Sequence, residues 1–376
     1  MNGRRVSPRF TDWTIVEESG STGLVDDRRP FFGGVDVEAR MGVIRRQINY
    51  IRENWDQYEQ FMSDLAQRLR TAVATLGAEA ELAQRLLSER RDWGKPGEVA
   101  TDFSALKLYT SDAGYRALFG IVNDSFRRDS FLQDERIARS AVFLIELLTI
   151  DLFNYRIANP ASDAFEGVVY RGMSVSNDDV DVFLNVMRQP VSQRFVSVPL
   201  GMLSSSTAPE VALRLAGTYA TASEARTTVL WRIHVLDLGE ELLDLYRRNF
   251  STSVVTSICA VPITGVSHFP EENEVLLRGP FFQILDVAWQ ANKSGGPDHV
   301  VVDAVMLNSN RDHVTNIAND RGDDLAMRTL FRVLVTQRRA RFAAKFATER
   351  GREDDGLAYQ RQLDGSLAEL RSLGIS

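Results

Sequence analysis

Two glutamates separated by one residue stand directly before an apolar run in the segment 267–279, SHFPEENEVLLRG. If a strand starts at ENE, Glu272 and Glu274 point to one side of it and Asn273 to the other, because side chains alternate along a strand. Two carboxylates on one face repel each other, which costs stability unless a cation or a reaction uses them. The commoner interpretation of EENE is a solvated acidic corner, and the pattern alone is compatible with both.

Two further segments contain residues that bind or orient charged groups. Arg171 and Gly172 lie near the end of the run VVYRGM. An arginine is therefore expected at the end of a predicted strand, followed by a glycine that leaves its backbone accessible. Ser204, Ser205 and Ser206 lie in MLSSSTAPEV, where three hydroxyls precede a predicted helix. Taken singly, such an arginine is usually a surface or core-rim residue, and a serine run before a helix is usually a turn and a cap.

The elements that must position these residues change character along the chain. Helical spacing of apolar residues predicts helices at about 78–91, from 111 onwards and over 135–156. Runs of β-branched and aromatic residues then predict strands in GVVYRGM, RFVSV, TTVLWRIHVLDLG, SVVTSICAVPI, EVLLRG, FFQILDVAWQ and HVVVDAVML. From about residue 323 a basic amphipathic pattern predicts a docked helix, followed by a short fraying helix over 363–376. Helices followed by strands, without strict βα alternation, predict an α+β fold.

A heptad pattern runs along the N-terminal part of the chain. Its members recur at steps of four and three residues and predict one long helix: Ile44, Ile48, Ile51, Trp55, Tyr58, Met62, Leu65 and Leu69. This seam can meet another copy of the chain or the chain's own domain. Packing within the chain is favoured, because Trp55 and Tyr58 are atypical of a dimeric seam.

Composition and charge argue against several classes of protein. The 376 residues are 44% hydrophobic and 25% charged, and the formal net charge of -7 argues against a general nucleic-acid binder. The single cysteine, Cys259, excludes an internal disulfide framework and is expected to be a small buried apolar residue. The four histidines show no metal-ligand spacing. With no Sec-type signal peptide and no stretch of about 18 apolar residues, no membrane span is expected.

Together, the three segments resemble the Arg-Ser-Glu class of mono-ADP-ribosyltransferases, which includes arginine-specific vertebrate enzymes and bacterial toxins. That family has an arginine at a strand end, an S-T-S-like strand and an E-x-E pair in this order, here YRG, LSSS and ENE. The flanks SHFPEENEVLLRG and LKLYTSDAGYRALFGIVNDSFR are also similar to family segments, and the resemblance covers about 101–307. Ser205 stands where threonine is usual and Met202 where phenylalanine is usual. The single cysteine is incompatible with the disulfide of the extracellular vertebrate members.

The resemblance implies NAD as a substrate, no metal, and a role for each matched residue. Arg171 would bind the NAD diphosphate with a guanidinium that stays charged. Gly172 would bring backbone close to the nicotinamide amide. Ser204 would hydrogen-bond the catalytic carboxylate and fix its rotamer, with Ser205 and Ser206 in the same NAD-binding segment.

The two glutamates would divide the reaction between them. Glu274 would stabilise the positive charge that develops on the ribose as nicotinamide leaves. Glu272 would pair with an arginine of a target protein, orient it and take a proton, and glutamate rather than glutamine here points to arginine. Phe269 would contact the target protein or anchor the turn. The sequence is also compatible with an NAD glycohydrolase, in which water replaces arginine, and with a catalytically silent partner-binding module.

The fold expected from the patterns and the resemblance is an ADP-ribosyltransferase-like mixed β core of two packed sheets, with helical extensions at both ends. The expected organisation is a flexible arm at 1–35 with a short ordered piece at WTIVEE, a helical extension at 36–100, a catalytic domain at 101–310 and a C-terminal helical extension at 311–376. The expected location is the cytoplasm, or delivery as an effector without a Sec-type signal peptide. The sequence makes no prediction of the oligomeric state.

Overall fold

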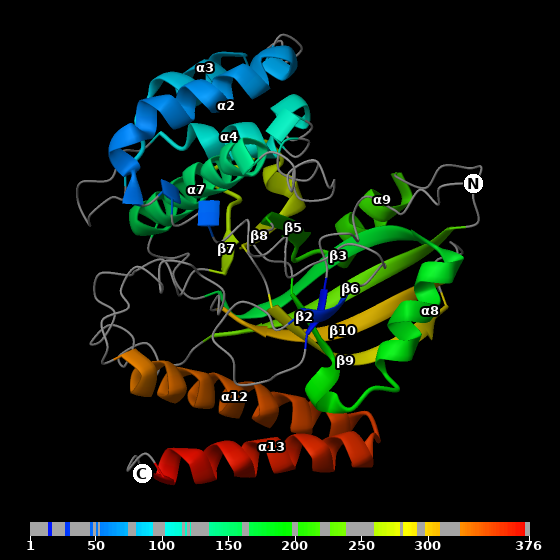
Figure 1. Ribbon diagram of the computed structural model, residues 1–376. Coiled ribbons are helices and arrows are strands. Elements are labelled where there is room, and N and C mark those ends of the chain that lie inside the picture. The colour runs from blue at the N-terminus through cyan, green and yellow to red at the C-terminus, as the bar shows by residue number, and fades with distance from the viewer. Residues whose placement is uncertain are drawn as a thin grey trace, which may run out of the picture.

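Two short strands open the described chain, helices follow them, and a mixed sheet then lies between these helices and a C-terminal helical hairpin in the computed structural model (Figure 1). This order of elements confirms the predicted α+β class, with helical segments before and after the eight described strands β3 to β10 (residues 167–307). The structure describes residues 14–16, 27–30, 46–47, 50–51, 53–73, 80–92, 102–114, 117–118, 121, 135–159, 165–197, 202–218, 226–237, 259–278, 281–291, 298–308 and 324–372.

Among the described residues, the helices between β2 (Asp27–Pro30) and β3 (Gly167–Ser176) share one apolar core. They are α2 (Tyr58–Val73), α3 (Ala80–Ser88), α4 (Ser104–Thr110) and α7 (Glu135–Ala158), with the 3-10 helix η1 (Trp55–Gln57) directly before α2. The heptad seam faces this core, because Ile51, Tyr58, Met62, Leu65 and Leu69 are at most 4% exposed. Packing of the seam within the chain is therefore confirmed. The prediction of one unbroken helix is wrong at η1, where the hydrogen bonding tightens. Ile44 and Ile48 lie outside the described residues.

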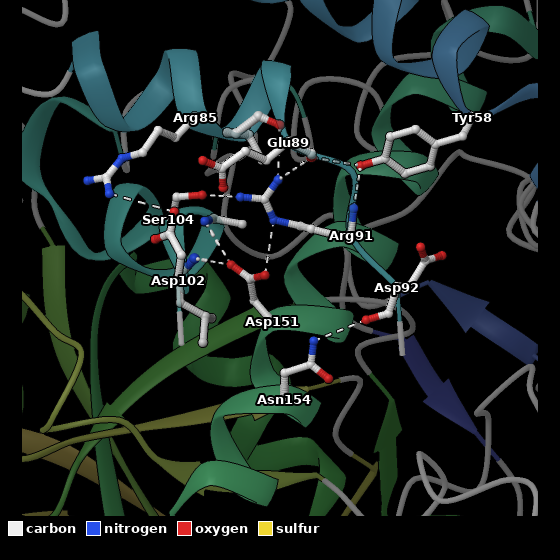
Figure 2. Close-up of polar contacts among 12 residues, drawn as sticks. Tyr58, Arg85, Glu89, Arg91, Asp92, Asp102, Ser104, Asp151 and Asn154 are labelled. Atoms are coloured by element: carbon white, nitrogen blue, oxygen red, sulfur yellow. Dashed lines mark hydrogen bonds and ion pairs between the residues drawn. The ribbon is translucent and has the colours of Figure 1, made fainter. Parts of the chain in front are cut away.

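A buried ion pair ties this helical cluster together (Figure 2). Nε of Arg91 donates to Oδ1 of Asp151 at 3.0 Å, and the two side chains are 6% and 2% exposed. The other oxygen of Asp151 accepts the backbone N–H groups of Ala105 and Leu106 at 2.8 and 3.3 Å. Asp151 of α7 therefore caps the N-terminus of α4, whose free N–H groups need such an acceptor. Burial raises the pKa of Asp151 to about 6, although Arg91 and the two N–H groups lower it.

The sheet contains ten strands in the order β2-β1-β4-β9-β10-β6-β3-β5-β8-β7. Only β10 and β6 pair in parallel among these neighbours of the described chain; the other pairs are antiparallel. The seven strand-like runs of the sequence each contain a strand, and the serine run forms another. Their bounds are Thr14–Val16 (β1), Asp27–Pro30 (β2), Gly167–Ser176 (β3), Phe195–Ser197 (β4), Met202–Ser206 (β5), Arg226–Leu236 (β6), Ala260–Pro262 (β7), Glu274–Arg278 (β8), Phe281–Gln290 (β9) and His299–Leu307 (β10). β1 confirms the short ordered piece at WTIVEE, whereas β2 was not predicted.

The sheet divides into two parts that face each other. β3 and β5 are joined by one bridge pair, Tyr170 with Ser206, so β5, β8 and β7 diverge from the larger part. Side chains of both parts then meet in a shared core, in which Leu203 and Leu277 pack with Val229 and Ile284. The predicted two packed sheets are thus present as packed layers, but one bridge makes their hydrogen bonding continuous. Helix α8 (Asn177–Val186) contributes to the same core.

Helices cover the outer faces of both parts. The N-terminal helical core includes Met202, Val261 and Leu276, so it covers the outer face of β5, β7 and β8. Helix α9 (Pro209–Thr218) packs on the outer face of the larger part, where Ala212 contacts Leu230. Two 3-10 helices, η4 (Val191–Gln193) and η6 (Pro270–Glu272), lead into β4 and towards β8 respectively.

The C-terminal hairpin of α12 (Asp324–Glu349) and α13 (Glu353–Ser372) lies below the larger part of the sheet (Figure 1). Its core joins Phe346 and Tyr359 to Val305 of β10. Basic residues take part in the docking, because Arg339 is buried with its guanidinium 4.7 Å from the centre of the Phe195 ring. The docked helix is confirmed. The short fraying helix over 363–376 is wrong, since residues 363–372 belong to the 20-residue α13, which packs along α12.

None of the helices among the described residues combines the length and apolar character needed to cross a membrane. Cys259 is buried as a free thiol, as predicted for a small apolar residue.

Candidate active site

A cavity opens where the two parts of the sheet diverge. It is lined by all eight residues that the sequence singled out, together with residues of α4 and α9: Tyr109, Thr110, Ser111, Asp112, Tyr170, Arg171, Gly172, Ser204, Ser205, Ser206, Val211, Ala212, Leu215, Phe269, Glu272 and Glu274. Divergence of the strands explains the place, because beyond the bridge between Tyr170 and Ser206 the facing edges of β3 and β5 have no ladder to close the gap. Side chains at the end of β5 and at the start of α9 can therefore point into the same cavity.

Glu274, the first residue of β8, is a buried carboxylate in this cavity. It is 8% exposed, and its Oε2 accepts a hydrogen bond from the Ser267 hydroxyl at 3.2 Å. Burial raises the pKa of Glu274 above its ordinary value, as does the neighbouring charge of Glu272. Hydrogen bonds from Ser204 and Ser267 and the charge of Arg171 lower it. The site thus holds a desolvated carboxylate whose direction is fixed by two hydroxyls.

Arg171 connects the two diverging strands from the middle of β3, which continues to Ser176, so the prediction that it lies at a strand end is wrong. Its Nη1 donates to the backbone carbonyl of Ser204 at 2.5 Å, so a guanidinium of β3 holds the strand that carries the Ser204 hydroxyl. Since Ser204 in turn donates to Glu274, a change at Arg171 reaches the carboxylate through both charge and position. The arrangement brings the predicted arginine, serine and glutamate together.

The other two serines use their hydroxyls within the fold. Ser205 donates to the carbonyl of Val275 in β8 at 2.6 Å. Ser206 donates to the carbonyl of Glu272 at 2.5 Å and accepts the N–H of Ala208 at 2.9 Å, directly before α9 begins. Both line the cavity, but these bonds position the loop and the helix.

Glu272 does not lie in the strand, which corrects the prediction that ENE starts it. Pro270–Glu272 form η6, and Asn273 adopts the left-handed conformation with φ 47° before β8 begins at Glu274. Asparagine is among the residues that tolerate this conformation. The turn, rather than strand alternation, sends both glutamates to the cavity. Burial raises the pKa of Glu272, while the charge of Arg214 lowers it.

Gly172 is required by the packing of α9 on β3. A Cβ atom at this position would stand 1.8 Å from the carbonyl oxygen of Ala212 and 2.8 Å from the Cβ of Ala216. Close approach of helix and strand therefore accounts for the glycine. The helix that it admits supplies one wall of the cavity.

Several residues of the site were not singled out in the sequence. The Tyr109 hydroxyl donates to the carbonyl of Met202 at 3.0 Å, and Thr110 Oγ1 accepts the N–H of His268 at 3.3 Å. The end of α4 thereby holds both β5 and the loop before η6. The only sequence signal for these two residues is that YT lies in a segment similar to the family. Ser267, which contacts Glu274, is likewise marked only by its place in SHFPEENEVLLRG, a segment similar to the family.

Among the described residues, no group of three or more His, Cys, Asp or Glu side chains is placed to hold a metal ion. The fold and the cavity define an α+β protein with a buried, hydroxyl-held carboxylate beside an arginine, where two diverging strands leave a gap. Its chemistry is that of a site able to stabilise a developing positive charge.

Comparison with known proteins finds likeness in structure rather than in sequence. No model of a known protein family matches the chain, and no curated protein matches it. Similar solved structures include the Vis toxin, an ADP-ribosyltransferase from Vibrio splendidus, with 16% identity over 65% of this chain and 85% of that chain and a TM-score of 0.32. The toxin Plx2a from Paenibacillus larvae, also an ADP-ribosyltransferase, has 14% identity over 64% of this chain and 96% of that chain, with a TM-score of 0.32. The eukaryotic mono-ADP-ribosyltransferase ART2.2 has 16% identity over 68% and 86%, with a TM-score of 0.31. Likeness at this level carries no argument about activity, which is inferred below from the residues of this chain.

Proposed function

We propose that this chain is a mono-ADP-ribosyltransferase that moves ADP-ribose from NAD to an arginine of a target protein and releases nicotinamide. One observation supports the proposal most directly: Arg171, Ser204 and the pair Glu272 and Glu274 come from three separate segments and line one cavity. A guanidinium, a hydroxyl and two carboxylates are the groups that this transfer needs. The proposal also explains why Glu274 is buried, because burying a carboxylate costs stability and a reaction that uses it accounts for that cost.

Glu274 is assigned to the bond-breaking step. As the bond between ribose and nicotinamide lengthens, positive charge develops on the ribose, and a preorganised carboxylate stabilises it. Burial strengthens this attraction because little water screens it. The hydroxyls of Ser204 and Ser267 fix the carboxylate before the substrate arrives, so little reorganisation is needed during the step.

Arg171 is assigned to the diphosphate of NAD. A guanidinium has five N–H donors in a planar fork, so the bond that it makes to the Ser204 carbonyl is compatible with donation to a phosphate oxygen. The same residue would then link substrate binding to the position of Ser204. Ser205, Ser206 and Gly172 support this end of the site through the strand and helix that they hold in place.

Glu272 is assigned to the acceptor. In the transfer, a guanidinium nitrogen forms a bond to C1′ of the ribose, nicotinamide leaves with the electron pair of its glycosidic bond, and the proton lost by the guanidinium passes to Glu272. The ion pair of Glu272 with Arg214 at 2.8 Å supports the assignment, since it places a guanidinium on this carboxylate. Phe269, on the same rim of the cavity, is assigned to contact with the target protein.

The test is the substitution Glu272→Gln, assayed with NAD and arginine methyl ester. The expected result is loss of ADP-ribosyl transfer to the ester, with nicotinamide release to water retained, because Glu274 remains intact. Equal loss of both reactions would contradict the division of roles. Nicotinamide release by the unaltered protein with no transfer of ADP-ribose to the ester would identify an NAD glycohydrolase instead, and no release at all would leave a binding module.

A further inference from the structure

The carboxylate assigned to the acceptor already holds a guanidinium of this chain. Nη2 of Arg214, on α9, lies 2.8 Å from Oε1 of Glu272. The arginine side chain is 62% exposed and the glutamate side chain 21% exposed, so the pair lies at the mouth of the cavity rather than inside it. A target arginine and Arg214 would therefore use the same carboxylate.

The pair is set up by the packing of α9 and η6, not by chance proximity of two long side chains. Ser206 donates to the carbonyl of Glu272, and the N–H of Thr207 donates to the carbonyl of Asn273 at 3.3 Å. The segment that leads into α9 is thus tied to the turn that carries Glu272. Close packing of α9 at Gly172 fixes the other side of the helix. Arg214 is held within reach of Glu272 whenever the cavity is formed.

The charges around Glu272 explain what the arginine does there. Besides burial, the carboxylates of Glu271 on η6 and Asp112 after α4 raise the pKa of Glu272, and the charge of Arg214 lowers it. Glu274 on β8 is a further negative neighbour. Arg214 thus favours the ionised form of Glu272 among like charges. It does so with a contact that is exposed to water and therefore weak enough to be displaced.

We propose that Arg214 is an internal competitor for the acceptor site, occupying Glu272 until the guanidinium of a target arginine displaces it. This inference rests on the proposed function. Because the exposed pair is weak, displacement lowers the apparent affinity for the acceptor only about two- to six-fold.

The experiment measures binding of arginine methyl ester to the full chain by NMR titration without NAD. Arg214→Gln is expected to tighten binding about two- to six-fold near neutral pH. In the Glu272→Gln background, Arg214→Gln is expected to leave the affinity for the ester unchanged, because the shared carboxylate is gone. Arg341→Gln, at an exposed position of α12, is the control for loss of one positive charge and leaves binding unchanged.

A second readout separates competition from a structural effect. Without Arg214 the pKa of Glu272 rises, so the pH below which the ester no longer binds moves upward in Arg214→Gln. Unchanged or weaker binding in Arg214→Gln, or tightening that persists in the Glu272→Gln background, would overturn the inference. The proposed function fails on a separate observation: the unaltered protein transfers no ADP-ribose to the ester. That outcome is independent of how the affinities of the unaltered protein and Arg214→Gln for the ester compare.

Discussion

The Ser267 hydroxyl lies 3.2 Å from Oε2 of Glu274 and also accepts the N–H of Phe269 at 3.1 Å. One serine therefore orients the buried carboxylate and holds the loop that leads to η6. Since the proposed reaction needs Glu274 ionised, every donor to its carboxylate extends the pH range of activity towards acid.

Ser267→Ala is expected to move the acidic limb of nicotinamide release upward by about one pH unit. The reason is that a hydrogen bond to a charged group is worth about 1.5 kcal/mol, and 1.36 kcal/mol corresponds to one unit of pKa. The measurement is the rate of nicotinamide release as a function of pH. Ser205→Ala serves as the control, because that hydroxyl bonds to a carbonyl of β8. A limb that shifts equally in both variants would contradict the role of Ser267.

Glu274→Gln is expected to raise thermal stability near neutral pH while it removes activity. Burial raises the pKa of Glu274 in the folded protein, so the folded state favours the protonated form. The stabilisation from protonation is complete below the unfolded pKa of about 4.3 and is lost as the pH rises through the folded pKa. Glutamine mimics the protonated acid. The melting temperatures of the two proteins should therefore converge at acidic pH and separate at neutral pH; a lower melting temperature for the variant at neutral pH would oppose this account.

Gly172→Ala is expected to destabilise the protein by about 1–3 kcal/mol, the usual cost of overpacking. The added Cβ would meet a backbone carbonyl of α9 at 1.8 Å, so the helix must move. Chemical denaturation measures the change. Gly217→Ala, within α9 and with no atom within 4 Å of the added Cβ, is the matched control and should cost no stability, because alanine is favoured over glycine in a helix. Similar losses in both variants would mean that the close approach of α9 to β3 is not the cause.

Asp151→Asn is expected to destabilise the protein by about 3–5 kcal/mol, because it leaves the buried guanidinium of Arg91 without its charge partner. The amide also lacks the second acceptor oxygen that caps α4. Denaturation of Asp364→Asn, an exposed site on α13, gives the baseline and should change stability by less than about 0.5 kcal/mol. Equal values for the two variants would show that the ion pair in Figure 2 does not hold the helical cluster.

The sequence predicted the elements that local pattern determines. β-Branched runs marked the strands, and the heptad seam marked the face of α2 that is buried. The serine and glutamate segments were visible because they lie at the ends of β5 and β8, where residue types are not set by the core. Arg171 was recognised by its residue type and by the resemblance, since it lies in the middle of β3 and not at its end. Their shared cavity required the strand order, which follows from pairing between distant segments.

Other features of the site depend on tertiary contacts and had no local signal. Side-chain alternation predicts that Asn273 lies in a strand, but the residue adopts the left-handed conformation in a turn. Ser206, just before α9, holds this turn by donating to the carbonyl of Glu272. An arginine on an exposed helix face, such as Arg214, looks like a solvated residue until the helix is docked. Gly172 suggested backbone near a ligand, whereas the packing of α9 also requires it.

The most direct test of the account is nicotinamide release from NAD by the unaltered protein and by Glu274→Gln, each with arginine methyl ester present. We predict release with transfer of ADP-ribose to the ester by the unaltered protein, and a rate at least about 100-fold lower in the variant, as expected when one well-placed charge-stabilising group is lost. NAD binding, measured separately by calorimetry, should persist in the variant. Release at the same rate in both proteins, or none in the unaltered one, would contradict the central claim.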